Sequence, residues 1–409
     1  LNDKFVNELF LNIEDTNFSE LIKICRKIIY QLEGGESNDK KILINWKNKY
    51  LNILTEKYST NLYSINFDIL KDIDIKKPKY SDSKEMVDGR IIIRDNFDKL
   101  LEKNSRLFIF GEDVGKIGDV NQGLEGLQKK HGKNRVFDTG IRESTIVGQG
   151  IGMSIRGLRP IAEIQYLDYI LYALQILSDD LATLTYRTLG GQKAPLIVRT
   201  RGHRLEGIWH SGSPLGGMLS FLKGIFILTP RNMTQAAGFY NSLLDIDQPA
   251  IVIEPLNGYR TKEQLPINYA EFKTPIGSVE VLKSGTDITI ISYGSTLNIV
   301  YEVAKELINY NIDCEVIDIQ SLIPFDIDMN ISKSIIKTNR LLIIDEDVPG
   351  GGSSFILQEL LNKQDIYKHL DSEPTLLTAN DHRPPYGTDG DYISKPSFED
   401  IFEKIYLIM

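Results

Sequence analysis

The sequence predicts an α/β protein with two doubly wound parallel-sheet domains preceded by a helical arm. Short apolar strands alternate with helical stretches from Arg90 onwards, and a proline-marked stretch at 264–275 interrupts the alternation before it resumes. Apolar strands that alternate with helices indicate a parallel sheet covered by helices on both faces. We therefore expect an arm and linker over 1–83, a first α/β domain over 84–265 and a second over 275–409.

The arm is polar and rich in Asn, Lys and Glu. Apolar side chains recur at near-helical spacing over 18–32, and a second helix is expected over 41–58. The segment 72–83 is charged and contains Pro78, so we expect a linker there. Such an arm is either a connector to a missing or separately encoded partner or a solvated pair of helices without a chemical role. For any single residue we favour the second interpretation.

The two domains follow from their strands and helices in order. In the first, a helix over 91–101 is expected to lead into a strand over 106–110. Further strands are expected over 135–137, 160–165, 195–200, 224–228 and 250–254, with helices from 143 onwards, over 169–186 and over 233–244. In the second, strands over 287–292, 314–319, 340–345 and 375–378 alternate with helices over 297–309, 326–338 and 352–361. Ligands bind such sheets at the carboxyl ends of strands, where Glu112, Glu143 and Tyr169 fall.

Composition excludes several classes of function. The chain of 409 residues is 42% apolar, enough for sizeable cores, and carries a net charge of -9. This acidic balance argues against nucleic acid or an anionic membrane as the main partner. No apolar run approaches a membrane span, and no signal peptide is visible. The two cysteines, Cys25 and Cys314, cannot form a disulfide framework or a metal cluster, so we expect a cytoplasmic protein that holds no metal itself.

Glu143 gives the clearest chemical signal. It starts an apolar helix, where burial or the helix dipole determines what a carboxylate can do. A capping box does not explain it, because Gly140 stands where Ser or Thr is required. Glycines within a helix cost about 1 kcal/mol each against Ala, and this helix contains Gly148, Gly150 and Gly152. They predict the close approach of a second helix across a subunit interface or of a cofactor ring.

Four stretches occur in order: 111–115 (GEDVG), 136–143 (VFDTGIRE), 162–169 (AEIQYLDY) and 209–214 (WHSGSP). Together they resemble the beta subunit, or beta half, of the thiamine-diphosphate-dependent 2-oxo acid dehydrogenase E1 component, within the wider transketolase-like family. The resemblance runs from about residue 85 to the C-terminus. It implies a transketolase-like pyrimidine-binding domain followed by a transketolase-like C-terminal domain.

The resemblance implies that the chain binds the pyrimidine end of thiamine diphosphate through Glu112, Ile141, Glu143 and Tyr169. Glu143 would hydrogen-bond N1′ of the aminopyrimidine and stabilise the imino tautomer, which deprotonates the thiazolium C2. Tyr169 would stack on the aminopyrimidine, a task that any aromatic face can perform, whereas Tyr166 would not. Glu112 would belong to a buried carboxylate relay between sites.

A further set of residues follows from the fourth stretch. His210 matches the histidine that assists acyl transfer to a lipoyl group, and His203 and Arg204 are weaker candidates for contact with the substrate or the lipoyl group. Arg204 also lies close in sequence to Arg199 and Arg201. These three arginines could bind an anionic substrate or a phosphate.

The resemblance also implies partners. The partner half of the family binds diphosphate and Mg²⁺ through a Gly-Asp-Gly stretch, and the nearest string here, at 388–391, lacks the leading glycine. Diphosphate and Mg²⁺ would therefore be held by an E1 alpha subunit or a fused alpha half, and Leu1 as first residue suits a fused polypeptide. We further expect a homodimer of beta parts, contact with an E2 lipoyl acyltransferase, and a 2-oxo acid substrate whose side chain the sequence does not specify.

The implied reaction is the oxidative decarboxylation of a 2-oxo acid, with transfer of the acyl group to a lipoyl group of E2. Two alternatives stay open. The chain could be the C-terminal half of another transketolase-like enzyme that acts on sugar phosphates, which the arginines near His203 would suit. It could also be a non-catalytic assembly module. The strings at 111–115 and 210–214 favour the E1 interpretation.

Overall fold

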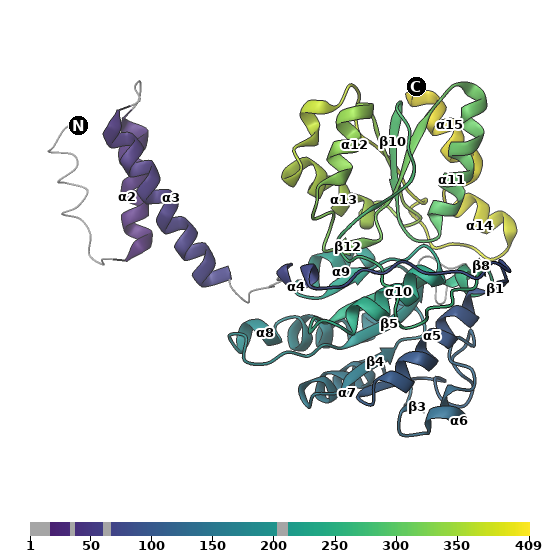
Figure 1. Cartoon of the computed structure of the whole chain (residues 1–409). Coiled ribbons are helices and arrows are strands. Elements are labelled where there is room, and N and C mark those ends of the chain that lie inside the picture. The colour runs from purple at the N-terminus through teal and green to yellow at the C-terminus, as the bar shows by residue number, and fades with distance from the viewer. Residues whose placement is uncertain (1–16, 33–36, 60–66, 203–211) are drawn as a thin grey trace. The chain divides into compact units, whose positions relative to one another are not determined.

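The computed structural model describes residues 17–32, 37–59, 67–202 and 212–409. The chain falls into two compact units, Leu1–Ser64 and Ile65–Met409 (Figure 1). Within the described ranges, no helix has both the length and the apolar character needed to cross a membrane.

The first unit is a helical hairpin. Helices α2 (Phe18–Gln31) and α3 (Asn38–Ser59) pack against each other, which confirms both predicted helices. The side chain of Asn17 caps α2 by accepting a hydrogen bond from the backbone N–H of Glu20 at 3.0 Å. Apolar side chains of α2 form the contact with α3, and the buried ones are Ile22, Ile24, Cys25 and Ile28.

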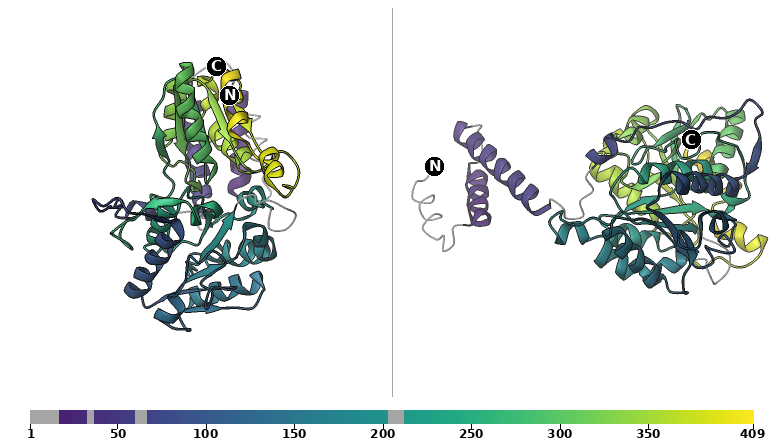
Figure 2. Two further views of the ribbon diagram at one scale, coloured as in Figure 1. Left: turned by 90° about the vertical axis from the view of Figure 1, so that its right-hand side faces the viewer. Right: turned by 60° about the horizontal axis from the view of Figure 1, so that its bottom comes forward.

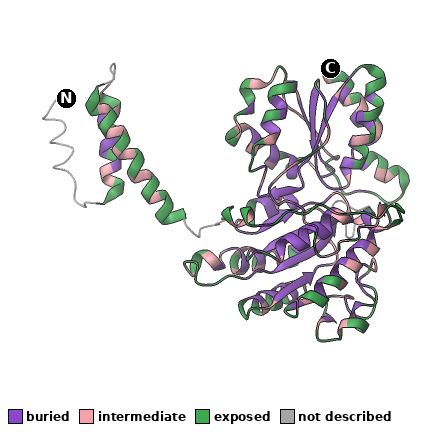
Figure 3. Ribbon diagram, in the orientation of Figure 1, coloured by how far each residue is buried: buried purple, intermediate pink, exposed green. Residues whose placement is uncertain are grey.

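The first α/β domain is built on a seven-stranded sheet with the order β12-β6-β7-β5-β4-β2-β3. All its strands are parallel except β12. The strands are β2 (Leu107–Gly111), β3 (Val136–Asp138), β4 (Arg159–Glu163), β5 (Ile197–Gly202), β6 (Phe226–Leu228), β7 (Ala250–Pro255) and β12 (Ser321–Ile323). Strands β4 to β7 are buried along their whole length, as expected for central strands covered on both faces (Figure 3).

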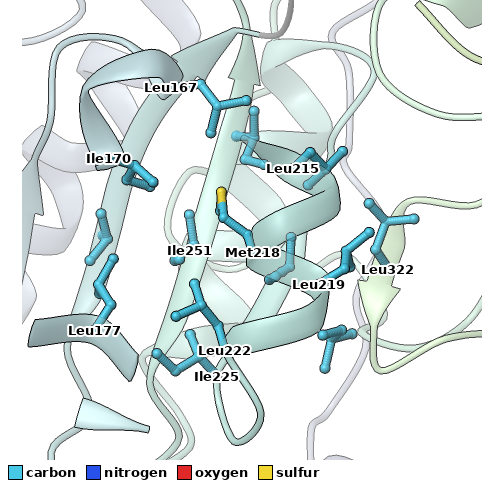
Figure 4. Packing of buried hydrophobic residues seen from close by; sticks show 14 of the residues in the cluster. Leu167, Ile170, Leu177, Leu215, Met218, Leu219, Leu222, Ile225, Ile251 and Leu322 are labelled. Atoms are coloured by element: carbon cyan, nitrogen blue, oxygen red, sulfur yellow. The ribbon is translucent and has the colours of Figure 1, made fainter. Parts of the chain in front are cut away.

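Helices cover this sheet on both faces. Helices α5 (Gly89–Lys103) and α10 (Met233–Leu243) pack on one face, and α7 (Glu143–Ile155) and α9 (Leu215–Phe221) contribute to the core on the other. Figure 4 shows α9 in the middle of this second core, with Met218 directed towards Ile251 of β7 and Leu219 towards Leu322 of β12. The same apolar cluster continues into the second domain, so the two domains share a core.

The second α/β domain holds a five-stranded sheet in the order β14-β13-β10-β11-β9, in which β9 alone runs antiparallel. Its strands are β9 (Glu280–Lys283), β10 (Ile288–Ser292), β11 (Cys314–Asp318), β13 (Leu341–Ile344) and β14 (Thr375–Leu377). Its helices lie on opposite faces (Figures 1 and 2), with α12 (Asn330–Thr338) and α13 (Gly352–Lys363) on one and α11 (Thr296–Glu306) and α15 (Phe398–Ile408) on the other. The predicted α/β alternation is confirmed in both domains.

Shorter elements complete the fold. They are α4 (Asp68–Lys71), β1 (Met86–Asp88), α6 (Leu127–His131), η3 (Leu256–Tyr259), β8 (Lys262–Gln264), η4 (Leu307–Tyr310), η5 (Ile366–His369) and α14 (Thr388–Ser394). Strands β1 and β8 form a two-stranded antiparallel ribbon at the two ends of the first domain's sequence.

One strand of the first sheet comes from an unexpected part of the sequence. Strand β12 follows β11 of the second domain, yet it pairs antiparallel with β6 through Ser321 and Leu228 and through Ile323 and Ile227. The sequence predicts no strand there, because the three residues of β12 are too few to show the alternation of apolar and polar side chains that marks a strand. The outer edge of the first sheet is therefore completed from within 275–409.

The long helix expected over 169–186 is divided. A 3-10 helix, η1 (Leu167–Ala173), is followed by a π-helix, η2 (Ile176–Leu181), and by α8 (Leu184–Arg187). Buried side chains repeat every three residues in η1, at Leu167, Ile170 and Ala173, which suits the tighter 3-10 turn. Asp168 lies inside η1, and Tyr166 takes its N-terminal cap position.

The segment 72–83, expected to be a linker, is held against the first domain. Ile73 is buried. The carbonyl oxygens of Lys76 and Lys79 accept hydrogen bonds from the N–H groups of Lys273 and Ile267, both at 2.8 Å. The segment is therefore a packed strap of the second compact unit.

Candidate active site

Three predicted site residues lie at neighbouring strand ends of the first sheet. Glu112 directly follows β2, Glu143 is the first residue of α7 after β3, and Tyr169 lies in η1 after β4. Since β2 pairs with both β3 and β4, the three segments leave the sheet side by side at its carboxyl edge. The fold thus brings together the segments that carry these side chains.

Glu112 and Glu143 are close enough to interact electrostatically. Burial raises the pKa of Glu112, and the carboxylates of Asp113 and Glu143 raise it further. Asp113 in turn accepts a hydrogen bond from the side-chain amide of Gln165 at 3.3 Å. A carboxyl with a raised pKa can, when it is protonated, donate a hydrogen bond to a neighbouring carboxylate and share the proton with it.

Ile141 and Glu143 lie at the start of α7. The side chain of Ile141 is 75% exposed, although it is large and apolar, and Glu143 is half-buried. Arg142 occupies the cap position without a side-chain hydrogen bond to the helix start. The N–H groups and dipole of this helix end therefore favour a negative charge at Glu143. The start of α7 therefore carries an exposed apolar side chain, Ile141, and a carboxylate, Glu143, two residues apart.

Tyr169 is fixed among other aromatic rings. It is half-buried and packs on the apolar core beside α7. Its ring meets that of Tyr166 edge to face, with 6.0 Å between centroids and an angle of 84°, and lies 6.2 Å from the ring of Tyr172. Edge-to-face and tilted contacts of this kind favour one ring orientation.

A buried ionic cluster, which the sequence did not predict, lies at the ends of β4, β5 and β7. Its members are all 0% exposed: Asp119, Glu163, Arg199, Arg201, Glu254 and Tyr259. Arg199 pairs with Asp119 and Glu254 at 2.9 and 3.0 Å and also with Glu163. Arg201 pairs with Glu163 at 3.1 Å. The prediction that Arg199 and Arg201 bind an anionic substrate or phosphate is therefore wrong, because internal carboxylates already occupy both.

The hydroxyl of Tyr259 joins the two guanidinium groups. It accepts from Nη2 of Arg199 at 2.8 Å and from Nε of Arg201 at 3.0 Å, and it donates to Glu254. Burial opposes the charge of Arg199, but the carboxylate of Glu254, with others, raises its pKa well above the usual value. Arg199 and Arg201 are two residues apart on a strand and so point to one face, a spacing that could have predicted a shared partner.

The buried ionic cluster is connected to the candidate site through Gln165. Nη1 of Arg201 donates to the backbone carbonyl of Gln165 at 3.0 Å, and the side chain of Gln165 donates to Asp113. The segment between β4 and η1, which leads to Tyr169, is thus hydrogen-bonded on one side to the cluster and on the other to the neighbour of Glu112.

His210, His203 and Arg204 lie outside the described residues, as does Trp209. The structure resumes at Gly212, and the hydroxyl of Ser213 donates to the carboxylate of Asp347 at 2.8 Å. A cavity of about 380 Å³ adjoins this point and is lined by Asp168, Leu171, Gly212, Ser213, Pro214, Asp347, Val348, Asp381, His382, Arg383 and Pro384. Asp168, next to Tyr169, is part of this wall.

A larger cavity, of about 730 Å³, lies elsewhere. It is bounded by the strap, the β1–β8 ribbon and the segment that joins the two domains, and none of the predicted site residues lines it. Across the described ranges there is also no group of three or more His, Cys, Asp or Glu side chains that could hold a metal ion. Neither observation points to a second catalytic centre.

Comparison with protein families identifies both domains. Residues 85–262 match the model of the transketolase pyrimidine-binding domain, and residues 277–392 match that of the transketolase C-terminal domain. Among solved structures, a split-gene transketolase in an inactive beta4 tetramer superposes with a TM-score of 0.62. That superposition covers 78% of this chain and 97% of the other at 18% identity, and so concerns the fold alone.

Curated relatives are more specific. A pyruvate dehydrogenase E1 component subunit beta of Acholeplasma laidlawii is 32% identical over 295 residues, which cover 72% of this chain and 89% of the relative. A 2-oxoisovalerate dehydrogenase subunit beta of Pseudomonas aeruginosa is 32% identical over 324 residues, covering 75% of this chain and 90% of the relative. The chain therefore belongs to the family of 2-oxo acid dehydrogenase E1 beta subunits, built from the transketolase pyrimidine-binding and C-terminal domains.

Proposed function

We propose that the chain is the beta part of a 2-oxo acid dehydrogenase E1 component. It would take part in the thiamine-diphosphate-dependent decarboxylation of a 2-oxo acid and in acyl transfer to a lipoyl group of an E2 acyltransferase. The observation that carries the proposal is that Glu143 lies close enough to Glu112, at the carboxyl edge of the sheet, for its charge to raise the pKa of Glu112, in a chain of this family.

The residues at this edge fit the pyrimidine end of the cofactor. An aminopyrimidine is a flat ring with a basic nitrogen, so it needs a carboxyl at that nitrogen, an apolar surface and an aromatic face. Glu143 supplies the carboxyl, Ile141 supplies a surface that is 75% exposed, and Tyr169 supplies an oriented ring. When bound, thiamine diphosphate supplies the electron sink that allows carbon dioxide to leave.

The chain's own residues hold and move protons around that ring. Glu143, at a helix N-terminus that favours its negative charge, would accept a hydrogen bond from N1′. Glu112, whose pKa is raised by burial and by the neighbouring carboxylates, would in its protonated form donate to Glu143 and exchange a proton with it. Tyr169 would orient the ring by stacking, and His210 would assist at the acyl-transfer step.

We further propose that this chain contributes only one half of the active site. An E1 alpha subunit or a fused alpha half would hold the diphosphate and Mg²⁺, and activity would require both parts. The beta parts would associate as a homodimer. Helix α7 supports this, because the surface at Gly148 and Gly152 is open and no atom comes within 4 Å of a Cβ placed there.

We also propose a cytoplasmic location. Cys25 and Cys314 are free thiols, which suits the reducing cytoplasm.

The sugar-phosphate alternative is less favoured. It rested on His203 and on three arginines able to bind a phosphate, and two of these, Arg199 and Arg201, are fully buried in internal ion pairs, whereas His203 and Arg204 lie outside the described residues. Beside E1 catalysis, the assembly-module interpretation is the one that an activity assay must address.

The test is reconstitution of the chain with its alpha part, followed by assay with pyruvate and with branched-chain 2-oxo acids. Glu143→Gln removes the ionisable group and keeps its size, so we expect decarboxylation to fall by about a hundredfold or more while assembly is retained. The matched control is Glu399→Gln, which changes a first-turn glutamate of α15 and should leave activity intact. Undiminished decarboxylation in the Glu143 variant would refute the proposed role.

Cofactor titration addresses the division of the site. Calorimetry with thiamine diphosphate and Mg²⁺ is expected to show binding to the assembled complex and none to the isolated chain. Tight Mg²⁺-dependent binding to the chain alone would contradict the proposal of a half-site.

A further inference from the structure

Two loops of the second domain reach the first domain beside the candidate site. One follows β13 and contains Asp347, which accepts the hydrogen bond of Ser213 at 2.8 Å. The other contains Arg383, whose Nη1 lies 3.8 Å from Oδ1 of Asp168. Ser213 and Asp168 both line the cavity of about 380 Å³, so each loop of the second domain contacts a different wall of it.

Asp347 is a rigid acceptor. Its side chain is 1% exposed, and its second carboxylate oxygen accepts from the N–H of Val348 at 3.0 Å. The backbone N–H of Asp347 donates to Asp345 at 3.0 Å. A Cβ at Gly351 would lie 2.7 Å from the carboxylate, so only glycine lets the following turn close on it. The oxygen that meets Ser213 is therefore fixed by its own loop.

The loop of Arg383 is tied to the same platform. The N–H of Ala379 donates to the carbonyl of Asp347 at 2.9 Å. The N–H of Asn380 donates to the carbonyl of Ser394 at 3.1 Å. Both contacts with the first domain thus start from one continuous, internally bonded part of the second domain.

Gly212 makes room for the second contact. A Cβ there would lie 1.8 Å from Oδ1 of Asp168 and 2.9 Å from Nη1 of Arg383. The backbone of Gly212 therefore packs against this pair, and the next residue, Ser213, makes the bond to Asp347. The two contacts meet at adjacent residues of one segment.

We infer that Asp347 and Arg383 are positioning residues, through which the second domain fixes Ser213 and Asp168 on the two walls of this cavity. The inference rests on the proposed function, because Asp168 precedes Tyr169 and Ser213 follows His210 by three residues. Asp347 acts on Ser213, which lies three residues after the histidine proposed for acyl transfer. Arg383 acts on the helix that carries the ring proposed to stack on the cofactor.

The test separates acyl transfer from decarboxylation in the chain assembled with its alpha part. An artificial oxidant such as dichlorophenolindophenol reports decarboxylation without a lipoyl acceptor, and a lipoylated domain reports acyl transfer. We expect Ser213→Ala and Asp347→Asn to slow lipoyl acylation by roughly tenfold while oxidant-linked decarboxylation changes by less than about twofold. Ser213→Thr, which keeps the hydroxyl, should restore acylation.

Ser295→Ala is the matched control. Ser295 is part-buried like Ser213 and donates to Glu346, the neighbour of Asp347, at 3.3 Å, but this bond stays within the second domain. We expect it to leave both rates unchanged. Equal slowing of both rates by the Ser213 and Asp347 variants, or a loss of thermal stability that accounts for the slowing, would overturn the positioning role of Asp347.

Arg383 is tested by a double-mutant cycle with Asp168. Arg383→Gln and Asp168→Asn should each raise the thiamine diphosphate concentration for half-maximal activity by about threefold, and the double variant should raise it no further. Additive effects would overturn the role of the pair. An inactive wild-type complex would instead refute the proposed function itself, which keeps the two failures distinct.

Discussion

Arg199 and Glu254 form a fully buried ion pair between β5 and β7, with 3.0 Å between Nε and Oε1. The same guanidinium group serves Asp119 and Glu163, so one arginine links carboxylates from three different segments. A cluster of this kind is costly to desolvate but far more costly to break, because each lost partner leaves a buried charge unpaired.

Tyr259→Phe should therefore destabilise the chain strongly. The substitution keeps the ring but leaves a donor on each of Arg199 and Arg201 without its acceptor, and Glu254 loses a donor. We expect the free energy of unfolding to fall by about 2–4 kcal/mol in urea denaturation. The control is Tyr406→Phe, whose ring is 58% exposed and should cost under about 0.5 kcal/mol. A small effect at Tyr259 would mean that its hydroxyl is dispensable to the cluster.

Asp318 should make stability depend on pH. It is fully buried between Arg231 and Gln235, and burial raises its pKa to about 6 against the ordinary value of 3.8. Because the folded state holds this proton more tightly than the unfolded state, the contribution of Asp318 to stability is fully present below about pH 4 and is lost as pH rises through 6. The loss amounts to about 3 kcal/mol for this one group.

Asp318→Asn removes that proton-linked term. Compared with the wild type, its free energy of unfolding should rise progressively between about pH 4 and pH 7, as measured by urea denaturation at several pH values. A difference between variant and wild type that stays constant over this range would show that Asp318 titrates normally.

Asp113→Asn should shift the pH dependence of activity. The carboxylate of Asp113 is one of the groups that raise the pKa of Glu112, so its removal should lower that pKa. Because the protonated form of Glu112 is the one proposed to serve Glu143, the alkaline limb of kcat against pH should move to lower pH. An unmoved limb, with the acid limb displaced instead, would assign the titration to another group.

The glycines of α7 should respond in opposite ways. A Cβ at Gly148 meets nothing within 4 Å, whereas one at Gly150 would lie 2.6 Å from Cδ1 of Leu196. Gly148→Ala should therefore raise the free energy of unfolding of the isolated chain by up to about 1 kcal/mol, and Gly150→Ala should lower it. Sedimentation then tests the homodimer, since an interface that requires the exposed glycine should be weakened by Gly148→Ala.

Much of the fold could be predicted because its parallel strands are buried on both faces and read as continuous apolar runs. Strand β7 is an example, and helix α10, which packs on the same sheet, was predicted equally well, since both lie within one residue of their expected bounds. Strand β12 could not be predicted, because its pairing with β6 is a long-range event without a local pattern. That 167–187 forms three short helices in place of one long helix could not be predicted either, since the spacing of its apolar residues is close to that of an ordinary α-helix.

For the candidate site, sequence placed Glu112, Glu143 and Tyr169 at strand ends that turn out to be neighbours. The prediction failed for Arg199 and Arg201, because sequence alone does not show that internal carboxylates already neutralise an arginine that could otherwise bind a substrate anion. These carboxylates come from segments far away in sequence. The spacing of the two arginines shows that they share a face of the strand, but it does not identify the carboxylates that neutralise them.

The pairing of β12 with β6 also bears on how the chain can be cut and recombined. A fragment ending at 275 would expose the whole edge of β6, a row of unpaired backbone groups in an apolar strand that invites association with other chains. Chimeras that exchange C-terminal domains between relatives would need to carry 319–325 together with the first domain. The first domain, as a folded unit that can be exchanged between relatives, is therefore made of two separate stretches of the sequence.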